Sequence, residues 1–149
     1  MKRQIKHFHT HLPTVNFPVM LRLIGLLLLI ESVFLLIPLG TSLWYGEREW
    51  RSFLFTFLLS AGCGASMAFL IHPHSLSMGK REGFLLTASV WVVFSLFGML
   101  PFILLREGAL SVSDAFFEAM SGFTTTGASP MLPIAHLPPG IIIWRSTMQ

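Results

Sequence analysis

Charged side chains are scarce in this sequence. Of its 149 residues, 11% are charged and 53% are hydrophobic, whereas a soluble domain carries about 25% charged residues. This deficit, together with 14 phenylalanines and 4 tryptophans, excludes an ordinary soluble domain and indicates an integral membrane protein. The single cysteine, Cys63, excludes a disulfide framework within one chain. No cleavable signal peptide is expected, because the first apolar run is longer than the usual h-region of about 7–15 residues.

Groupings of catalytic residues are lacking too. The apolar segments hold no cluster of His, Glu and Asp and no nucleophile–base pair at helical spacing, so we expect neither an enzyme nor a bound cofactor. His7, His9 and His11 alternate in the polar, basic residues 1–17 without an accompanying Cys, Asp or Glu. Because chain termini are usually mobile, we interpret this stretch as a cytosolic tail, with a metal site as the alternative. No nucleic-acid partner is expected.

Three apolar segments are long enough to cross a bilayer, whose hydrocarbon core of about 30 Å needs about 20 helical residues. The first lies between Pro18 and Pro38, which suit a helix start and a helix end. The second covers residues 52–71, and a polar loop rich in aromatics is expected between the two, at residues 39–51. Residues 18–71 are therefore predicted to form two accessory transmembrane helices.

The third predicted span covers residues 83–105, and Pro101 is expected to kink or finish it. Basic residues flank the start of the first span and the end of the second, and fewer lie on the opposite side. By the positive-inside rule, this bias predicts a cytoplasmic N-terminus. The basic residues placed inside are Lys2, Arg3, Lys6, Arg22, Lys80 and Arg81, and those placed outside are Arg48, Arg51 and Arg106.

Two features of the accessory spans concern helix packing. The small-residue patch GCGAS at residues 62–66 predicts the close approach of another helix, with a hinge as the alternative. Glu31 lies deep in the first span, and an intramembrane carboxylate is a candidate functional site. For Glu31 we favour the alternative of a hydrogen bond or ion pair with a neighbouring helix.

The segment DAFFEAMSGFTTTGASP, residues 114–130, is too short and too polar at its end to cross a membrane. It predicts a helix over residues 113–122, capped by Ser111 or Ser113, with Asp114 in the first turn, where the helix dipole favours a negative charge. About nine residues at 1.5 Å each span about 13 Å, which is under half of the bilayer. Such a segment must enter the membrane and turn back, with its irregular backbone lining a watery path.

The residues that follow this short helix suit a monovalent cation. Gly122 is expected to end the helix, so that its last carbonyls stabilise a cation near mid-membrane. The β-branched Thr124, Thr125 and Thr126 favour an extended backbone that presents carbonyl groups in series. Gly127 can adopt a positive φ and lets backbones approach an axis. Because rings of carbonyls that replace a hydration shell form potassium filters, this pattern predicts such a filter.

Residues 123–128, the predicted filter strand, contain no carboxylate, so a ring of Asp or Glu is not indicated. Glu118 is expected to anchor the short helix or to border the mouth of the pore. Asp114, Glu118 and Gly122 are thus the expected support of the filter. The alternative is an ordinary Thr-rich turn in a structural or assembly subunit, whose helices pack through the small-residue patch.

The order of a span, a short helix with the motif DAFFEAMSGFTTTGAS and a further span resembles the first membrane–pore–membrane repeat of the Trk/Ktr/HKT superfamily of potassium transporters. The segments REGFLL (81–86), LPFILL (100–105) and WRSTMQ (144–149), and the two additional N-terminal spans, are similar to its Trk branch. This resemblance covers essentially the whole chain. It implies an all-α integral membrane fold in which residues 83–149 form the first pore repeat, and residues 140–149 begin a second helix that is cut short.

The resemblance also implies a function and partners. In the family, four such repeats in one polypeptide surround one pore, and Thr124 to Gly127 match the filter strand of the first repeat. Potassium uptake across the bacterial inner membrane, a homodimer and a cytosolic nucleotide-binding regulatory subunit follow as expectations. Since one repeat is present, we expect a fragment that supplies one of four filter strands and does not conduct alone. The choice of K⁺ over Na⁺, and of a channel over H⁺- or Na⁺-coupled transport, stays open.

Overall fold

The computed structural model of the protein describes residues 16–73, 78–106, 108–131 and 137–149. Within these residues the regular structure is helical and no strand occurs, which confirms the predicted all-α fold. In chain order the helices are α1 (Phe17–Phe34), α2 (Leu36–Trp44), α3 (Trp50–Leu70), α4 (Lys80–Gly98), α5 (Leu100–Ile103), α6 (Val112–Phe123) and α7 (Pro139–Met148).

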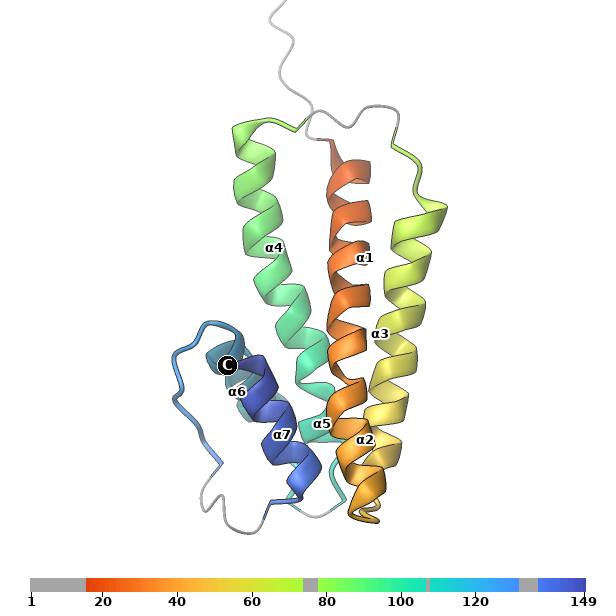
Figure 1. Cartoon of the computed structure of the whole chain (residues 1–149). Coiled ribbons are helices and arrows are strands. Elements are labelled where there is room, and N and C mark those ends of the chain that lie inside the picture. The colour runs from red at the N-terminus through yellow and green to blue at the C-terminus, as the bar shows by residue number, and fades with distance from the viewer. Residues whose placement is uncertain (1–15, 74–77, 107, 132–136) are drawn as a thin grey trace, which may run out of the picture.

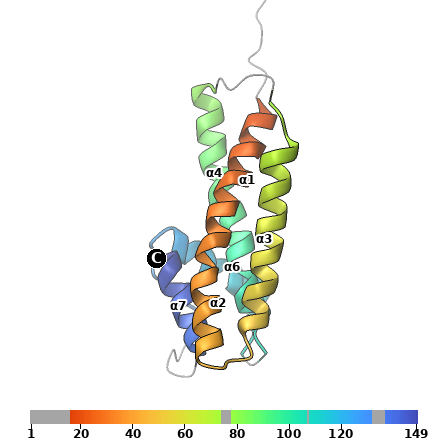
Figure 2. The ribbon, with the colours of Figure 1, turned by 45° about the vertical axis from the view of Figure 1, so that its right-hand side comes forward.

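Three helical stretches in the described residues are long and apolar enough to cross a membrane, namely Phe17–Trp44, Trp50–Leu70 and Lys80–Ile103. They correspond to the three predicted spans. α1 lies between α3 and α4, and the short helices α5, α6 and α7 gather around the lower part of this bundle (Figures 1 and 2). The long helices therefore form a frame beside which the short segment is held.

The first span continues past the proline at which the sequence pattern predicts its end. α1 ends at Phe34, but α2 follows at once and runs to Trp44, so the predicted loop from residue 39 is wrong up to that point. Pro38 lacks an N–H, and its ring crowds the carbonyl of the residue four positions earlier, which is Phe34. Hydrogen bonding resumes around this point, since the Leu39 amide donates to the Leu35 carbonyl at 3.2 Å. The proline interrupts the span without terminating it.

Pro101 has a similar effect on the third span, as expected. α4 ends at Gly98, and the four-residue helix α5 begins at Leu100. The break leaves carbonyl groups at the end of α4 without helical partners. One of them, the Gly98 carbonyl, accepts a hydrogen bond of 3.0 Å from the buried indole Nε1 of Trp144 in α7. The kink thus provides an attachment point for the last helix.

α1 and α3 approach closely where two glycines face each other. A Cβ on Gly25 would lie 2.8 Å from the Gly64 carbonyl oxygen, and a Cβ on Gly64 would lie 2.9 Å from the Gly25 carbonyl oxygen. The predicted small-residue packing is therefore present at Gly64. Gly62, in the same patch, has no atom within 4 Å of its would-be Cβ among the described residues. Only one face of the patch is in contact, because residues two apart point away from each other on a helix.

A single apolar core joins these elements at the end of the bundle where α6 and α7 lie. Its fully buried members include Phe53 of α3, Phe102 of α5, Ala115 of α6 and Ile141 of α7. Because the accessory spans contribute to this core, they support the short helices directly as well as crossing the membrane.

We predict that Gly25→Ala destabilises the protein and that Gly62→Ala does not. The added methyl at Gly25 meets backbone atoms of α3, and overpacking of this kind costs about 1–3 kcal/mol. Unfolding of the purified protein in detergent, followed by circular dichroism, measures both variants. Equal unfolding free energies for the two variants would contradict the glycine contact between α1 and α3.

Candidate functional site

α6 is a short helix that ends part of the way along α4. Its 12 residues at 1.5 Å each are about 18 Å long, well short of the bilayer core of about 30 Å. Figure 1 shows α6 and α7 beside the lower part of the long helices, with the segment after α6 passing outside them and running back down. The helix begins and ends one residue beyond the predicted residues 113–122. This arrangement fits a segment that enters a membrane and turns back.

The start of α6 is capped as its sequence predicts. Of the two candidate serines, Ser111 is the cap, because its Oγ accepts a hydrogen bond from the Asp114 amide at 3.2 Å. The Asp114 carboxylate in turn accepts a hydrogen bond of 2.7 Å from the Ser111 hydroxyl. The acidic side chain therefore lies at the positive end of the helix dipole, where it is stabilised.

The end of α6 differs from the prediction. Gly122 does not end the helix: it lies in the last turn, where a Cβ would be 3.1 Å from the Met148 Cβ. Its small size therefore serves the packing of α7 on α6. The helix ends one residue later, at Phe123, and Thr124 is its C-cap.

The threonine run is a tight turn in its first part, so the prediction of an extended Thr124–Thr126 is wrong there. The Thr126 amide donates to the Ser121 carbonyl at 2.9 Å, and the Thr125 amide donates to the Gly122 carbonyl at 2.9 Å. This pair of bonds is the Schellman motif, which closes the end of a helix through a residue in the left-handed conformation. That residue is Thr125, with φ of 55°. The hydrogen bonds to the carbonyls at the end of α6 stabilise the turn by more than the preference of β-branched residues for an extended backbone disfavours it.

Two residues of the turn have positive φ. One of them is Thr125. Positive φ in a β-branched residue is unusual and strained, and such strain clusters at functional sites. Gly127, with φ of 74°, adopts the conformation that the sequence predicts for it. Thr124, Thr125, Thr126 and Gly127 are all exposed, and within the described residues no donor reaches their carbonyl oxygens. In the described part of the chain, these four consecutive carbonyl groups therefore accept no hydrogen bond.

Glu118 binds both α7 and the segment that follows this turn. Its side chain is 2% exposed, and its Oε1 lies 2.7 Å from Nε of Arg145 in α7. Its Oε2 accepts a hydrogen bond of 2.6 Å from the Ser129 hydroxyl, just after the turn. The Ser121 hydroxyl also donates to the Ala128 carbonyl at 2.6 Å. Two side chains of α6 therefore hold the segment that follows the turn.

Arg145, Ser129 and Ser121 belong to the site, although the sequence analysis does not single them out. Arg145 carried a usable signal: it is the one charge in the apolar start of α7, and an intramembrane charge requires a partner of opposite sign. Glu118, in an apolar short helix, was the matching acid. The two serines carried no such signal, because serine hydroxyls commonly bond to nearby groups both in helices, as at Ser121, and beside turns, as at Ser129.

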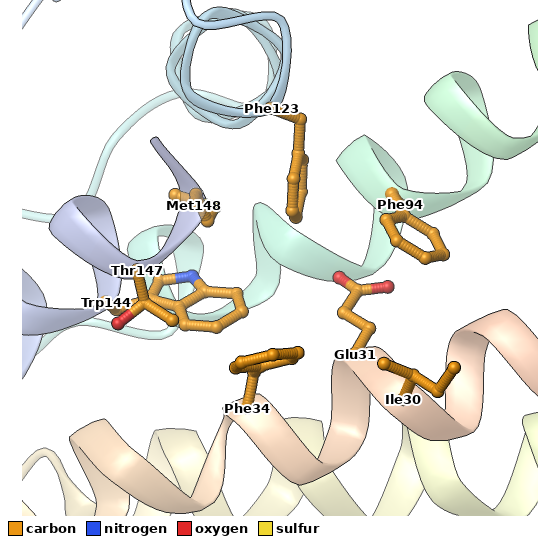
Figure 3. Close-up of a pocket in the computed structure, with 8 residues that line it drawn as sticks. All are labelled: Ile30, Glu31, Phe34, Phe94, Phe123, Trp144, Thr147 and Met148. Carbon is orange, nitrogen blue, oxygen red and sulfur yellow. The ribbon is translucent and has the colours of Figure 1, made fainter.

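Among the described residues, Glu31 lacks the neighbouring partner that we favoured. Its side chain is 3% exposed, and neither carboxyl oxygen has a hydrogen-bond partner among the described residues. The carboxyl points into a cavity between α1, α4, α6 and α7 (Figure 3). His7, His9 and His11 lie outside the described residues, and within those residues no group of three or more His, Cys, Asp or Glu is arranged to hold a metal.

Several known proteins are similar to this chain in sequence and in fold. Over 136 residues, 91% of the chain, it is 39% identical to the Trk system potassium uptake protein TrkH of Halomonas elongata. Over 135 residues it is 33% identical to TrkH of Escherichia coli K12. The crystal structure of the potassium transporter TrkH from Vibrio parahaemolyticus matches 87% of the chain with a TM-score of 0.81 and 36% identity. No protein-family model matches the chain.

Three helices of membrane-spanning length define a multi-pass membrane protein. The shared identity and fold support a membrane subunit of the Trk type, and the resemblance predicted from its motif is confirmed. The chain spans 28% of the length of each of these three relatives.

We predict that Thr125→Gly stabilises the protein, whereas Thr124→Gly destabilises it. Left-handed backbone costs a non-glycine residue about 1–2 kcal/mol, which exceeds the entropic cost of glycine of about 0.5–1 kcal/mol. Thr124 has an ordinary φ of −82°, and its hydroxyl donates to the Met120 carbonyl, so its replacement only loses interactions. Unfolding free energies of the two variants in detergent should therefore shift in opposite directions. Shifts of the same sign would show that Thr125 is unstrained.

We also predict that Arg145→Met destabilises the protein by about 3–5 kcal/mol, the usual cost of leaving one member of a buried ion pair alone. Adding Glu118→Gln to this variant should restore most of the loss, since neither charge then remains. A double-mutant cycle on unfolding free energies measures the coupling, with Arg48→Met, in an exposed loop, as the control. Additive effects of the two substitutions would contradict the ion pair.

Proposed function

We propose that the chain contributes to potassium uptake across the bacterial inner membrane, and that Thr124, Thr125, Thr126 and Gly127 form one strand of a selectivity filter. The observation that carries this proposal is the exposed turn whose four carbonyl groups have no donor within the described residues. Potassium is selected by carbonyl oxygens that replace its hydration shell. The names of the relatives, which are potassium uptake proteins, support the same ion.

The backbone of the turn supports this role. Thr125 and Gly127, two residues apart, both have positive φ. Positive φ at Gly127 lets the backbone approach a ligand closely. The C-terminal end of α6 precedes the turn directly, and the negative end of its dipole favours a cation there. No side-chain carboxylate occurs in the turn, so the dehydration of the ion would rest on the backbone.

A carbonyl ring needs several strands, and this chain contains one. Since the chain spans 28% of its relatives' length, we propose that it is a fragment supplying one of four filter strands, with the remaining repeats of a longer protein as partners. By the same family membership we propose a homodimer, a cytosolic nucleotide-binding regulatory subunit and a cytoplasmic N-terminus. The activity is transport and involves no covalent chemistry.

The second candidate is a structural or assembly subunit in which the turn binds no ion. The contact between Gly25 and Gly64 favours strong helix packing in either case, so packing does not separate the two functions. The strained Thr125 does favour the filter, because a turn without a function has no need to retain strain.

We predict that Gly127→Ala lowers potassium uptake by about tenfold, a rate factor equal to about 1.4 kcal/mol. The test protein is a chimera in which residues 1–149 replace the matching part of Vibrio parahaemolyticus TrkH, assayed by potassium-limited growth and rubidium-tracer uptake. A Cβ at Gly127 meets no atom within 4 Å in the described structure, so any loss comes from the backbone conformation and not from a clash.

Gly108 provides a matched control for that experiment. Its φ of 73° is close to the 74° of Gly127, and its would-be Cβ also meets no atom within 4 Å in the described structure. Gly108→Ala therefore introduces the same backbone strain outside the turn. Unchanged uptake and cation selectivity in Gly127→Ala, or an equal loss in both variants, would reject the filter and favour the structural subunit.

A further inference from the structure

A cavity of about 160 Å³ lies between α1, α4, α6 and α7, beside the end of the short helix. Its lining is mostly apolar and contains one carboxyl group, that of Glu31 (Figure 3). An apolar cavity of about 150 Å³ in another protein is large enough to hold benzene. The cavity beside Glu31 therefore has room for a small organic molecule.

The Glu31 carboxyl is buried and its charge is not compensated. Its side chain is 3% exposed, and both oxygens lack a hydrogen-bond partner among the described residues. A lone charge at membrane depth is costly. The carboxyl group must therefore carry either a proton or a cation as its partner.

The elements packed against Glu31 supply no cation within the described residues. The cavity residues of α4, α6 and α7 are uncharged, and the nearby Arg145 is paired with Glu118. Besides Glu31, the two polar side chains of the lining already donate hydrogen bonds to other groups. The Trp144 Nε1 donates to the Gly98 carbonyl, and the Thr147 hydroxyl donates to the Ile143 carbonyl. Among the described residues, no group is therefore left to pair with the Glu31 carboxylate.

Aromatic side chains surround the carboxyl group on the remaining sides. Phe34 of α1, Phe94 of α4, Phe123 of α6 and Trp144 of α7 each contribute one ring (Figure 3). Ring faces attract organic cations, and aromatic cages recognise substituted ammonium ions. Metal cations such as Ca²⁺ instead require several oxygen ligands, which this lining does not offer. A carboxylate with four aromatic rings beside it is suited to bind an ammonium ion.

We propose that this cavity binds a small alkylammonium ion paired with the Glu31 carboxylate. The open side lies at Ile30 and Phe34, whose side chains are 53% and 49% exposed, so that the ligand enters from the apolar face of the bundle. It enters as the neutral amine and takes the proton of the Glu31 carboxylic acid. One O–H bond breaks, one N–H bond forms, and the ammonium carboxylate pair remains neutral overall. Ligand binding does not depend on the proposed potassium transport.

The bound ion would contact α6, the helix that directly precedes the turn. Phe123 is the last residue of α6 and precedes Thr124 directly. Its ring packs edge-to-face on Phe94, with centroids 5.5 Å apart. A ligand in the cavity therefore contacts the last residue of the short helix.

The test uses the purified protein in detergent and two probes of the same shape, tert-butylammonium chloride and tert-butanol. Binding to the folded state raises the unfolding midpoint with ligand concentration, which yields a dissociation constant for each probe. We expect tert-butylammonium to raise the midpoint and tert-butanol to have no such effect. In Glu31→Gln, which removes the charge and keeps the shape, we expect affinity to fall about tenfold or more.

Glu49→Gln, in the loop before α3, is the control and should bind tert-butylammonium as the wild type does. Phe94→Leu keeps the carboxyl group and removes one ring, so it should weaken binding even where Glu31→Gln fails to fold. The proposal is overturned by an equal response to the alcohol, by no response of the wild type, or by unchanged affinity in Glu31→Gln or Phe94→Leu.

Discussion

The buried ion pair between Glu118 and Arg145 is the constraint on which the rest of this structure depends. Neither charge can remain alone in an apolar environment, so α6 and α7 must meet at this point. The second oxygen of the carboxylate binds Ser129, which attaches the segment after the turn to the same centre. One acidic side chain thus fixes the short helix, the helix that follows it, and the backbone between them.

The frame around this pair is made by close approaches and interrupted helices. Small residues at Gly25, Gly64 and Gly122 let backbones and side chains of neighbouring helices come together. The kink before Pro101 exposes the Gly98 carbonyl, and Trp144 binds it from α7. The break in the third span thereby provides a hydrogen-bond acceptor for α7. In a membrane, where every backbone polar group must be satisfied by protein, such a bond serves both helices.

Much of the architecture could be predicted from the sequence. Apolar length gave the three spans, and the short helix followed from its caps, its length and the glycine near its end. The errors were local. Pro38 was expected to end a helix, but proline removes only one hydrogen bond, and the bond from the Leu39 amide to the Leu35 carbonyl continues the helix. The threonines were expected to be extended, but the carbonyls at the end of α6 recruited their amides into a turn.

The site shows where sequence reasoning stops. Composition, apolar length and the motif from Asp114 to Gly127 determined by themselves the membrane class, the resemblance to the Trk family and the place of the turn, because these depend on neighbours in the chain. Only the tertiary structure decided that Glu118 pairs with Arg145 and that Glu31 has no partner among the described residues. Those facts depend on which side chains from distant segments share one volume, and residue type and spacing do not encode it.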